Sequence, residues 1–287
     1  MRNVRSLRSF MAMRRLGISA VGLALIGVTA VGPGGGSNAA GEGLPARTGA
    51  EAPLVLPDLV QRVPLDIGVE AVGPTSNRRF RLGFISAVAN LGSGPLIVRG
   101  HRPAGVEGQM TADQLVRRSD GSLLRRRAVG RLAFVRSSDH RHWHYLDFDR
   151  YELRSASGAV RVRRDRKTGF CLGDRYPAAP AEERAPQAYT SRCGLERPDL
   201  RSVTQGISVG YGDDYAAQLE GQFVDVTGLP GGRYHLVHRA NADRAVLEED
   251  YGNNSASVLV RLSWPRGRDQ PPSVRELRAC DAECRRP

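Results

Sequence analysis

The amino-acid sequence predicts a mainly β fold: a β-sandwich-like domain with long loops and few short helices. From about residue 56, short apolar stretches recur between turn signals at intervals of about 8–12 residues, which is typical of sandwiches. Few stretches keep the apolar period of about 3.6 residues that marks an amphipathic helix. The exception is TADQLVRR at residues 111–118, which predicts one short helix capped by Thr111.

Residues 1–40 have the order of parts found in secretory signals. Five arginines and no acidic residue precede an apolar run over 16–31, and small residues ending in Ala39-Ala40 follow. The run is too short and glycine-rich for a membrane anchor, which needs about 20 apolar residues. We therefore expect a secreted, extracellular protein with no stable membrane anchor; the sequence leaves general and twin-arginine export open. Residues 41–55, rich in Gly, Ala and Pro, are expected to form a linker.

Four segments of the chain predict strands. RFRLGFISAVANLGSGPLIVRG gives two strands around NLGSG, a connection typical of hairpins. WHYLDFDRYELRS and NNSASVLVRLSW alternate apolar and polar residues, and GQFVDVTGLPGGRYHLVHRAN gives a strand, a turn and a strand. These patterns predict a domain over residues 56–265, with the Arg- and Pro-rich residues 266–287 as a loose tail.

The basic charge of the chain does not point to nucleic acid. The formal net charge is +12, but the arginines are spread out and the aromatic residues, 6% of the chain, do not interleave with them. Four cysteines in an exported chain favour two disulfides, Cys171–Cys193 and Cys280–Cys284. A zinc site at the last pair is the alternative, and the lack of a second ligand pair nearby speaks against it.

Three of the six histidines lie in SSDHRHWHYLDF, at His140, His142 and His144. On a strand, residues i, i+2 and i+4 share one face, so the three imidazoles could converge on one ion. Imidazole suits copper, zinc, iron or nickel, and a structural role for three histidines in this register is the weaker alternative. The sequence therefore predicts a metal site without identifying the metal.

The chain contains one lysine, Lys167, among 42 basic residues. Arginine replaces lysine where only positive charge is needed, but its guanidinium cannot supply a neutral primary amine. The retained lysine therefore indicates amine chemistry, such as a Schiff base or a covalent cross-link. Chance survival is the alternative.

Six motifs, taken in order, resemble the catalytic domain of the lysyl oxidase family over residues 56–265. They are LPDL, FISAVANLGSGPL, HRHWHY, RKTGFCL, QGISVGYGDDYAAQLEGQFVDVTGLPGGRYHLV and EEDYGNN. The resemblance implies a secreted, mostly β copper amine oxidase, with copper on His140, His142 and His144. It also implies a self-derived lysine tyrosylquinone cofactor made from Lys167, which precedes Phe-Cys-Leu, and Tyr215. Such an enzyme converts primary amines or peptidyl-lysine to aldehydes with molecular oxygen, and releases ammonia and hydrogen peroxide.

The resemblance leaves some features open. The chain has fewer cysteines than vertebrate members, and no histidine stands just ahead of the triplet. Some members bind calcium, for which the resemblance suggests Glu152, Glu248, Asn253 and Asn254; a β-turn capped by the asparagines is the alternative. The sequence assigns no general base, and Asp147, Asp149 and Asp165 are expected to be solvated surface carboxylates. A non-catalytic secreted copper-binding β-sandwich and a zinc or iron enzyme remain rival interpretations.

Overall fold

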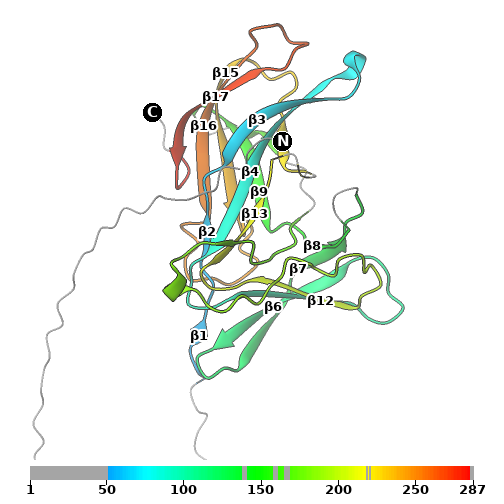
Figure 1. Ribbon diagram of the computed structural model, residues 1–287, viewed down its shortest axis with the longest axis vertical. Coiled ribbons are helices and arrows are strands. Elements are labelled where there is room, and N and C mark those ends of the chain that lie inside the picture. The colour runs from blue at the N-terminus through cyan, green and yellow to red at the C-terminus, as the bar shows by residue number, and fades with distance from the viewer. Residues whose placement is uncertain are drawn as a thin grey trace, which may run out of the picture. The chain divides into compact units, whose positions relative to one another are not determined.

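A computed structural model describes residues 51–137, 141–157, 161–164, 169–217, 219 and 221–284 of the chain. The described residues form a mainly β structure, as the sequence predicts, whose strands fall into three antiparallel sheets (Figure 1). The helical segments among them are two single 3₁₀ turns, Thr75–Asn77 and Ala181–Glu183. In the described part of the chain, no helix is long and apolar enough to cross a membrane.

The three sheets are built from strands far apart in the sequence. The first contains β12 (Ser202–Ile207), β5 (Leu96–His101), β6 (Met110–Arg118), β7 (Leu123–Phe134) and β8 (Trp143–Tyr145), with β1 (Leu54–Val55) on β6. The second contains β10 (Arg161–Arg164), β9 (Asp149–Ser155), β15 (Gly232–Ala240), β16 (Ser255–Ser263) and β17 (Ser273–Cys280). The third contains β11 (Tyr176–Pro177), β13 (Tyr211–Tyr215), β4 (Arg79–Asn90) and β14 (Phe223–Asp225), with β2 (Leu59–Gln61) and β3 (Leu65–Val72) on the other edge of β4.

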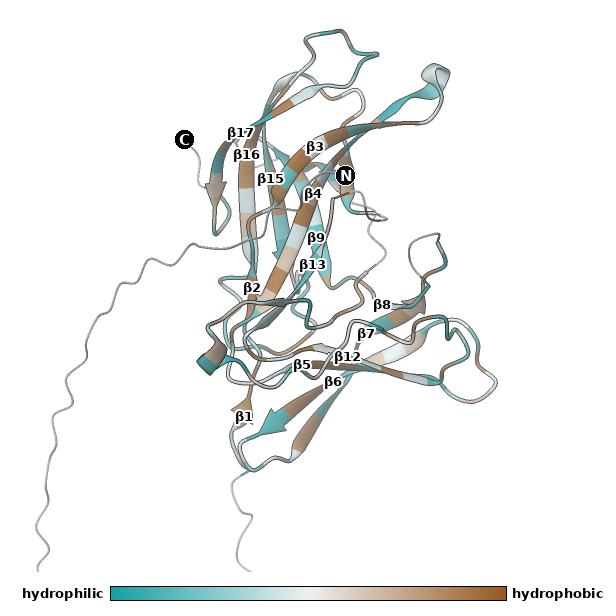
Figure 2. Ribbon diagram, viewed as in Figure 1, coloured by the Kyte–Doolittle hydropathy of each residue, from teal (hydrophilic) through white to brown (hydrophobic). Residues whose placement is uncertain are grey.

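The second and third sheets pack face to face, so the predicted sandwich is present. Phe84 on β4 meets Tyr151 on β9 edge to face, with ring centroids 4.9 Å apart. Both side chains belong to the apolar core, and hydrophobic residues alternate with polar ones along β4 and β16 (Figure 2). Alternate residues of a strand face one side, so this packing places every second residue of β4, β9 and β15 in the interior.

Three local predictions are wrong. Residues 111–118 form most of strand β6, not a helix, because pairing with β5 and β7 on both sides outweighs local propensity. β4 and β5 do not form a hairpin around NLGSG; they belong to different sheets. Residues after Pro265 are not a loose tail, because β17 pairs with β16 along its length.

The structure also tests where the folded unit begins and how the cysteines pair. β1 lies inside the segment expected to be linker and pairs with Arg117 and Arg118 of β6. The structure confirms both disulfides, Cys171–Cys193 and Cys280–Cys284. The first joins two cysteines 22 positions apart and begins at the end of the segment that follows Lys167, and the second closes the end of β17.

Candidate functional site

Two of the three motif histidines are described, and their rings face each other. The Nε2 atoms of His142 and His144 lie 2.8 Å apart, with ring centroids 4.8 Å apart. His144 is on β8 and is 2% exposed, whereas His142 directly precedes the strand and is half-buried. His140 lies outside the described residues. Among the residues that the structure describes, no cluster of three or more histidine, cysteine or acidic side chains forms a complete metal site.

Strand β8 is held by the segment that follows Lys167. Tyr145 and Phe170 exchange backbone hydrogen bonds of 2.7 and 3.0 Å in both directions. On the other side of His144, the Trp143 amide donates to the carbonyl of Cys193 at 2.9 Å. Because Cys193 is joined to Cys171, the disulfide ties both neighbours of His144 to one short stretch of chain.

Tyr215, at the end of β13, reaches this same stretch. Its hydroxyl oxygen accepts a 2.7 Å hydrogen bond from the Cys171 amide and lies 3.1 Å from the Cys171 carbonyl oxygen, to which it donates. Its ring meets Phe170 edge to face at 4.7 Å between centroids. Burial, and then the charge of Asp213, raise the pKa of Tyr215 well above its ordinary value, so the phenol stays protonated at neutral pH.

Gly169 fixes the chain two residues after Lys167. It has φ +108°, and a Cβ there would lie 2.4 Å from the Tyr145 carbonyl oxygen, so only glycine fits. Residues 165–168, including Lys167 and Asp165, lie outside the described residues. The structure therefore brings Gly169–Cys171, His144 and Tyr215 together, although 48 positions separate Lys167 from Tyr215 in the sequence.

The expectation that Asp149 is a solvated carboxylate is wrong. Its side chain is 1% exposed, and Oδ2 lies 2.5 Å from Nε2 of His238. Both residues face the sandwich interior, Asp149 from β9 and His238 from β15. Asp147 is exposed, as expected. Sequence analysis missed His238, because it lies 89 positions from Asp149 and only strand pairing brings the two together.

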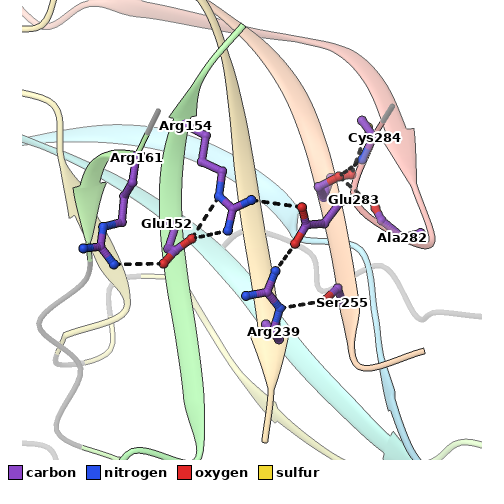
Figure 3. Close-up of polar contacts among 9 residues, drawn as sticks. Glu152, Arg154, Arg161, Arg239, Ser255, Ala282, Glu283 and Cys284 are labelled. Carbon is purple, nitrogen blue, oxygen red and sulfur yellow. Dashed lines mark hydrogen bonds and ion pairs between the residues drawn. The ribbon is translucent and has the colours of Figure 1, made fainter. Parts of the chain in front are cut away.

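Glu152 does not join the other residues suggested for calcium. It lies on the opposite face of β9 from Asp149, and Arg154 and Arg161 hold its carboxylate at 2.6 and 3.3 Å (Figure 3). Glu283 forms further ion pairs with Arg154 and with Arg239. Burial alone would raise the pKa of Glu152, but the arginines outweigh it and lower the pKa. Arginines thus neutralise this carboxylate, which argues against calcium there.

Glu248, Asn253 and Asn254 instead gather around Asp58, which sequence analysis did not consider. Glu248 Oε1 accepts from Asn254 Nδ2 at 2.6 Å, and its Oε2 accepts from the Leu59 amide at 3.0 Å. Asn253 Nδ2 donates to Asp58 at 2.8 Å. The side-chain oxygens of Asn253 and Asn254 are buried without a hydrogen-bond partner among the described residues. The LPDL motif contained Asp58, but only the fold shows that it meets the EEDYGNN turn.

Burial raises the pKa values of Asp58 and Glu248. In each case desolvation is the main cause, and neighbouring acids add to it: Asp250 and Glu249 at Asp58, and Asp58 at Glu248. Negative charge is therefore concentrated at this place, next to unsatisfied amide oxygens, and a bound cation would relieve it.

Comparison with known proteins identifies the family. The lysyl oxidase family model matches residues 124–265. Protein-lysine 6-oxidase of Rattus norvegicus is 33% identical over 127 residues, which are 44% of this chain and 28% of the relative. Lysyl oxidase homolog 1 of Homo sapiens is 34% identical over 121 residues, 41% of this chain and 18% of the relative.

A third relative, protein-lysine 6-oxidase of Sus scrofa, is 32% identical over 127 residues, 44% of this chain and 46% of the relative. The match thus spans less than half the length of each of these proteins. The match to the family model, over residues 124–265, includes the histidine motif, Lys167, Tyr215 and the EEDYGNN turn, and it leaves out Asp58. Over residues 124–265, the chain belongs to the lysyl oxidase family.

Proposed function

We propose that this protein is a secreted, copper-dependent amine oxidase that uses a lysine tyrosylquinone made from Lys167 and Tyr215. It converts primary amines, including peptidyl-lysine, to aldehydes, and molecular oxygen is reduced to hydrogen peroxide as ammonia is released. The family supports amine oxidation in general, and the two disulfides fit an oxidising, extracellular compartment.

The histidine geometry supports a copper site on His140, His142 and His144. The Nε2 atoms of His142 and His144 lie 2.8 Å apart, so the two imidazoles point to one place, where they would hold copper together with His140. Copper there supplies the redox chemistry with oxygen that converts a tyrosine to a quinone.

The observation that carries the proposal is the position of the Tyr215 hydroxyl against Cys171. This contact, at 2.7 Å from the Cys171 amide, places the phenol four residues along the chain from the only lysine. Gly169 and the Cys171–Cys193 disulfide fix the end of that segment beside His144. A surface copper protein without catalysis has no need for a phenol held against the segment that follows the only lysine.

The residues of the site also control protonation. The buried Tyr215 phenol keeps its proton until oxidation begins, because burial and Asp213 oppose a phenolate. Lys167 joins the ring through a neutral primary amine, which arginine cannot provide. Phe170 covers the ring edge-on and helps to exclude water from it.

A calcium ion is proposed at a second place, the Asp58–Glu248 cluster. Carboxylate and amide oxygens are the ligands that calcium prefers. Asp58, Glu248, Asn253 and Asn254 supply such oxygens, and Glu152 is replaced in this set by Asp58 because arginines hold Glu152 elsewhere. Calcium at this cluster would tie β2 to the turn that precedes β16, outside the copper and tyrosine site.

Peptide mapping tests the proposal directly. The mature chain is expressed with copper and digested, and mass spectrometry searches for a peptide that joins the Lys167 and Tyr215 segments. We expect the cross-link, a positive quinone stain and peroxide release from primary amines. Lys167→Arg should keep copper but lose all three, whereas Tyr211→Phe, which changes the other tyrosine of β13, should keep all three. Copper without a cross-link in the wild type would favour a non-catalytic copper protein, and preference for zinc or iron would favour the other rival.

A further inference from the structure

The interior of the sandwich contains a polar network around Asp149 and His238. A carboxylate and an imidazole lie 2.5 Å apart there, with side chains 1% and 0% exposed. Burying these polar groups removes their hydration, which offsets much of what their hydrogen bond regains, so the pair is a weak stabiliser of a fold. Stability alone therefore does not explain why this pair occupies a core position.

The hydrogen bonds fix which nitrogen of His238 carries the proton. The Gln61 side-chain nitrogen lies 2.6 Å from the Ala87 carbonyl oxygen and 2.7 Å from His238 Nδ1. An atom that contacts a carbonyl oxygen is the amide donor, so Nδ1 accepts from Gln61. Nε2 then carries the hydrogen and donates to Asp149 at 2.5 Å, so this bond orients the Asp149 carboxyl group as an acceptor.

The network leads to the tyrosine site. Ser86 lies 3.3 Å from His238 Nε2 through its hydroxyl oxygen, and 3.1 Å from the Tyr151 hydroxyl. Ser86 is also the β4 residue paired with Tyr215 of β13. Paired residues of antiparallel strands lie side by side on one face, so Tyr215 borders this network directly.

Aromatic side chains also connect the neighbourhood of Asp149 to Tyr215. Phe148, which precedes Asp149, packs on Phe170 at 5.8 Å between centroids, and Phe170 packs on Tyr215. The Tyr151 ring covers His238 at 4.5 Å. Within the network, Gln222 accepts from the Tyr151 hydroxyl at 2.9 Å, while its own buried amide nitrogen has no partner among the described residues.

We propose that Asp149, held by His238, is the proton acceptor for amine oxidation at the Tyr215 site. This inference rests on the proposed function. Oxidation of an amine breaks a C–H bond at the α-carbon, and the proton would pass to an Asp149 oxygen, giving a carboxylic acid. The quinone made from Tyr215 would supply the acceptor for the electron pair, molecular oxygen would be the final two-electron oxidant, and the acid would then lose its proton. His238 is the positioning residue, because its Nε2–H aims the carboxylate.

Kinetics of the copper-loaded mature enzyme test this role, with Asp149→Asn as the main variant and Asp147→Asn as the exposed control nearby. Removal of a general base lowers kcat by about 10²–10⁴-fold, and loss of a transition-state contact alone leaves KM within about threefold. We therefore expect Asp149→Asn to lower kcat by about 10²–10⁴-fold with little change in KM, and to keep wild-type copper content and quinone stain. Asp147→Asn should have near wild-type kinetics. His238→Gln, whose amide can still donate, should lower kcat about tenfold.

A second test, by NMR spectroscopy, does not depend on catalytic activity. In the copper-free wild type, NMR should show His238 as the Nε2–H tautomer, with a strongly deshielded Nε2 proton that Asp149→Asn removes and Asp147→Asn keeps. The proposal is overturned by a kcat for Asp149→Asn within about threefold of wild type, by loss of copper or quinone in that variant, or by the Nδ1–H tautomer. Absence of quinone in the wild type would overturn the proposed function instead, while the NMR arm would still test the pair.

Discussion

At the scale of single residues, two positions of the site each require one residue type: glycine at 169 and lysine at 167. Gly169 stands at φ +108° with the Tyr145 carbonyl oxygen 2.4 Å from the place of a Cβ. Lys167 supplies an amine that 41 arginines cannot. The requirement at Gly169 comes from the contact between the segment after Lys167 and strand β8, so a substitution at Gly169 should disturb the whole site.

We predict that Gly169→Ala lowers the free energy of unfolding by about 3 kcal/mol or more and abolishes the cross-link, because backbone strain and a clash with Tyr145 add up. Gly105→Ala is the control: it also has positive φ, but nothing lies within 4 Å of its added Cβ. It should cost only about 1 kcal/mol and leave the cross-link intact. Urea unfolding and peptide mapping measure both effects. Equal costs for the two variants would contradict the close approach at Gly169.

At the scale of elements, the strand that ends the described chain is held by contacts that its sequence does not show. Most β17 side chains are exposed, so its composition looks like that of a tail. Pairing with β16 supplies its backbone hydrogen bonds. Beyond the strand, Glu283 reaches Arg154 and Arg239 across the second sheet (Figure 3), and the Cys280–Cys284 disulfide holds Glu283 in that position.

The two disulfides should therefore have different effects when removed. Replacing Cys280 and Cys284 by alanine should lower the free energy of unfolding by about 2 kcal/mol and leave the cross-link unchanged, because the loop is short and remote from Tyr215. Replacing Cys171 and Cys193 should cost about 3 kcal/mol and also reduce cross-link formation, because Cys171 holds the Tyr215 hydroxyl. Urea denaturation and mass spectrometry distinguish the pairs; full cross-linking without Cys171–Cys193 would contradict the positioning role.

At the scale of the whole molecule, packing sets the pH and calcium dependence of stability. The pKa values of Asp58 and Glu248 are raised from 3.8 and 4.5, mainly by burial. A carboxyl with a raised pKa in the folded state stabilises the fold fully below its unfolded pKa. That contribution is lost as pH rises through the folded pKa, because the ionised form is then buried. Calcium should reverse the loss by binding the ionised form.

In copper-free protein without calcium, we predict that Glu248→Gln increases thermal stability more at pH 7.5 than at pH 4.5. With calcium at about 100 times its dissociation constant, the wild type should gain about 2.7 kcal/mol at pH 7.5, and Glu248→Gln much less. Glu152→Gln is the matched control, because arginines hold Glu152, and it should keep the calcium response. Calorimetry measures these shifts. An equal calcium response in the wild type and in Glu248→Gln would contradict the proposed ligand set.

Some features of the fold and the site can be predicted from the sequence alone, and others cannot. The β class, both disulfides and the family follow from local patterns: strand alternation, an even cysteine count and motifs in order. The helix at 111–118, the NLGSG hairpin and the loose tail are wrong, because strand pairing is decided by partners far along the chain. The interpretation of Asp149 as solvated is wrong for the same reason, and the ion pairs of Glu152 with Arg154 and Arg161 likewise depend on the fold.

The sequence by itself determined the residue types: three histidines in alternation, one lysine, and a tyrosine in a recognisable stretch. Only the tertiary structure decided which of them meet. It sets the Tyr215 hydroxyl against Cys171, turns Asp149 inward to His238, and separates Glu152 from Glu248. The physical reason is that chemistry is a property of a side chain, whereas proximity and burial arise when distant strands pair and two sheets close over one interior.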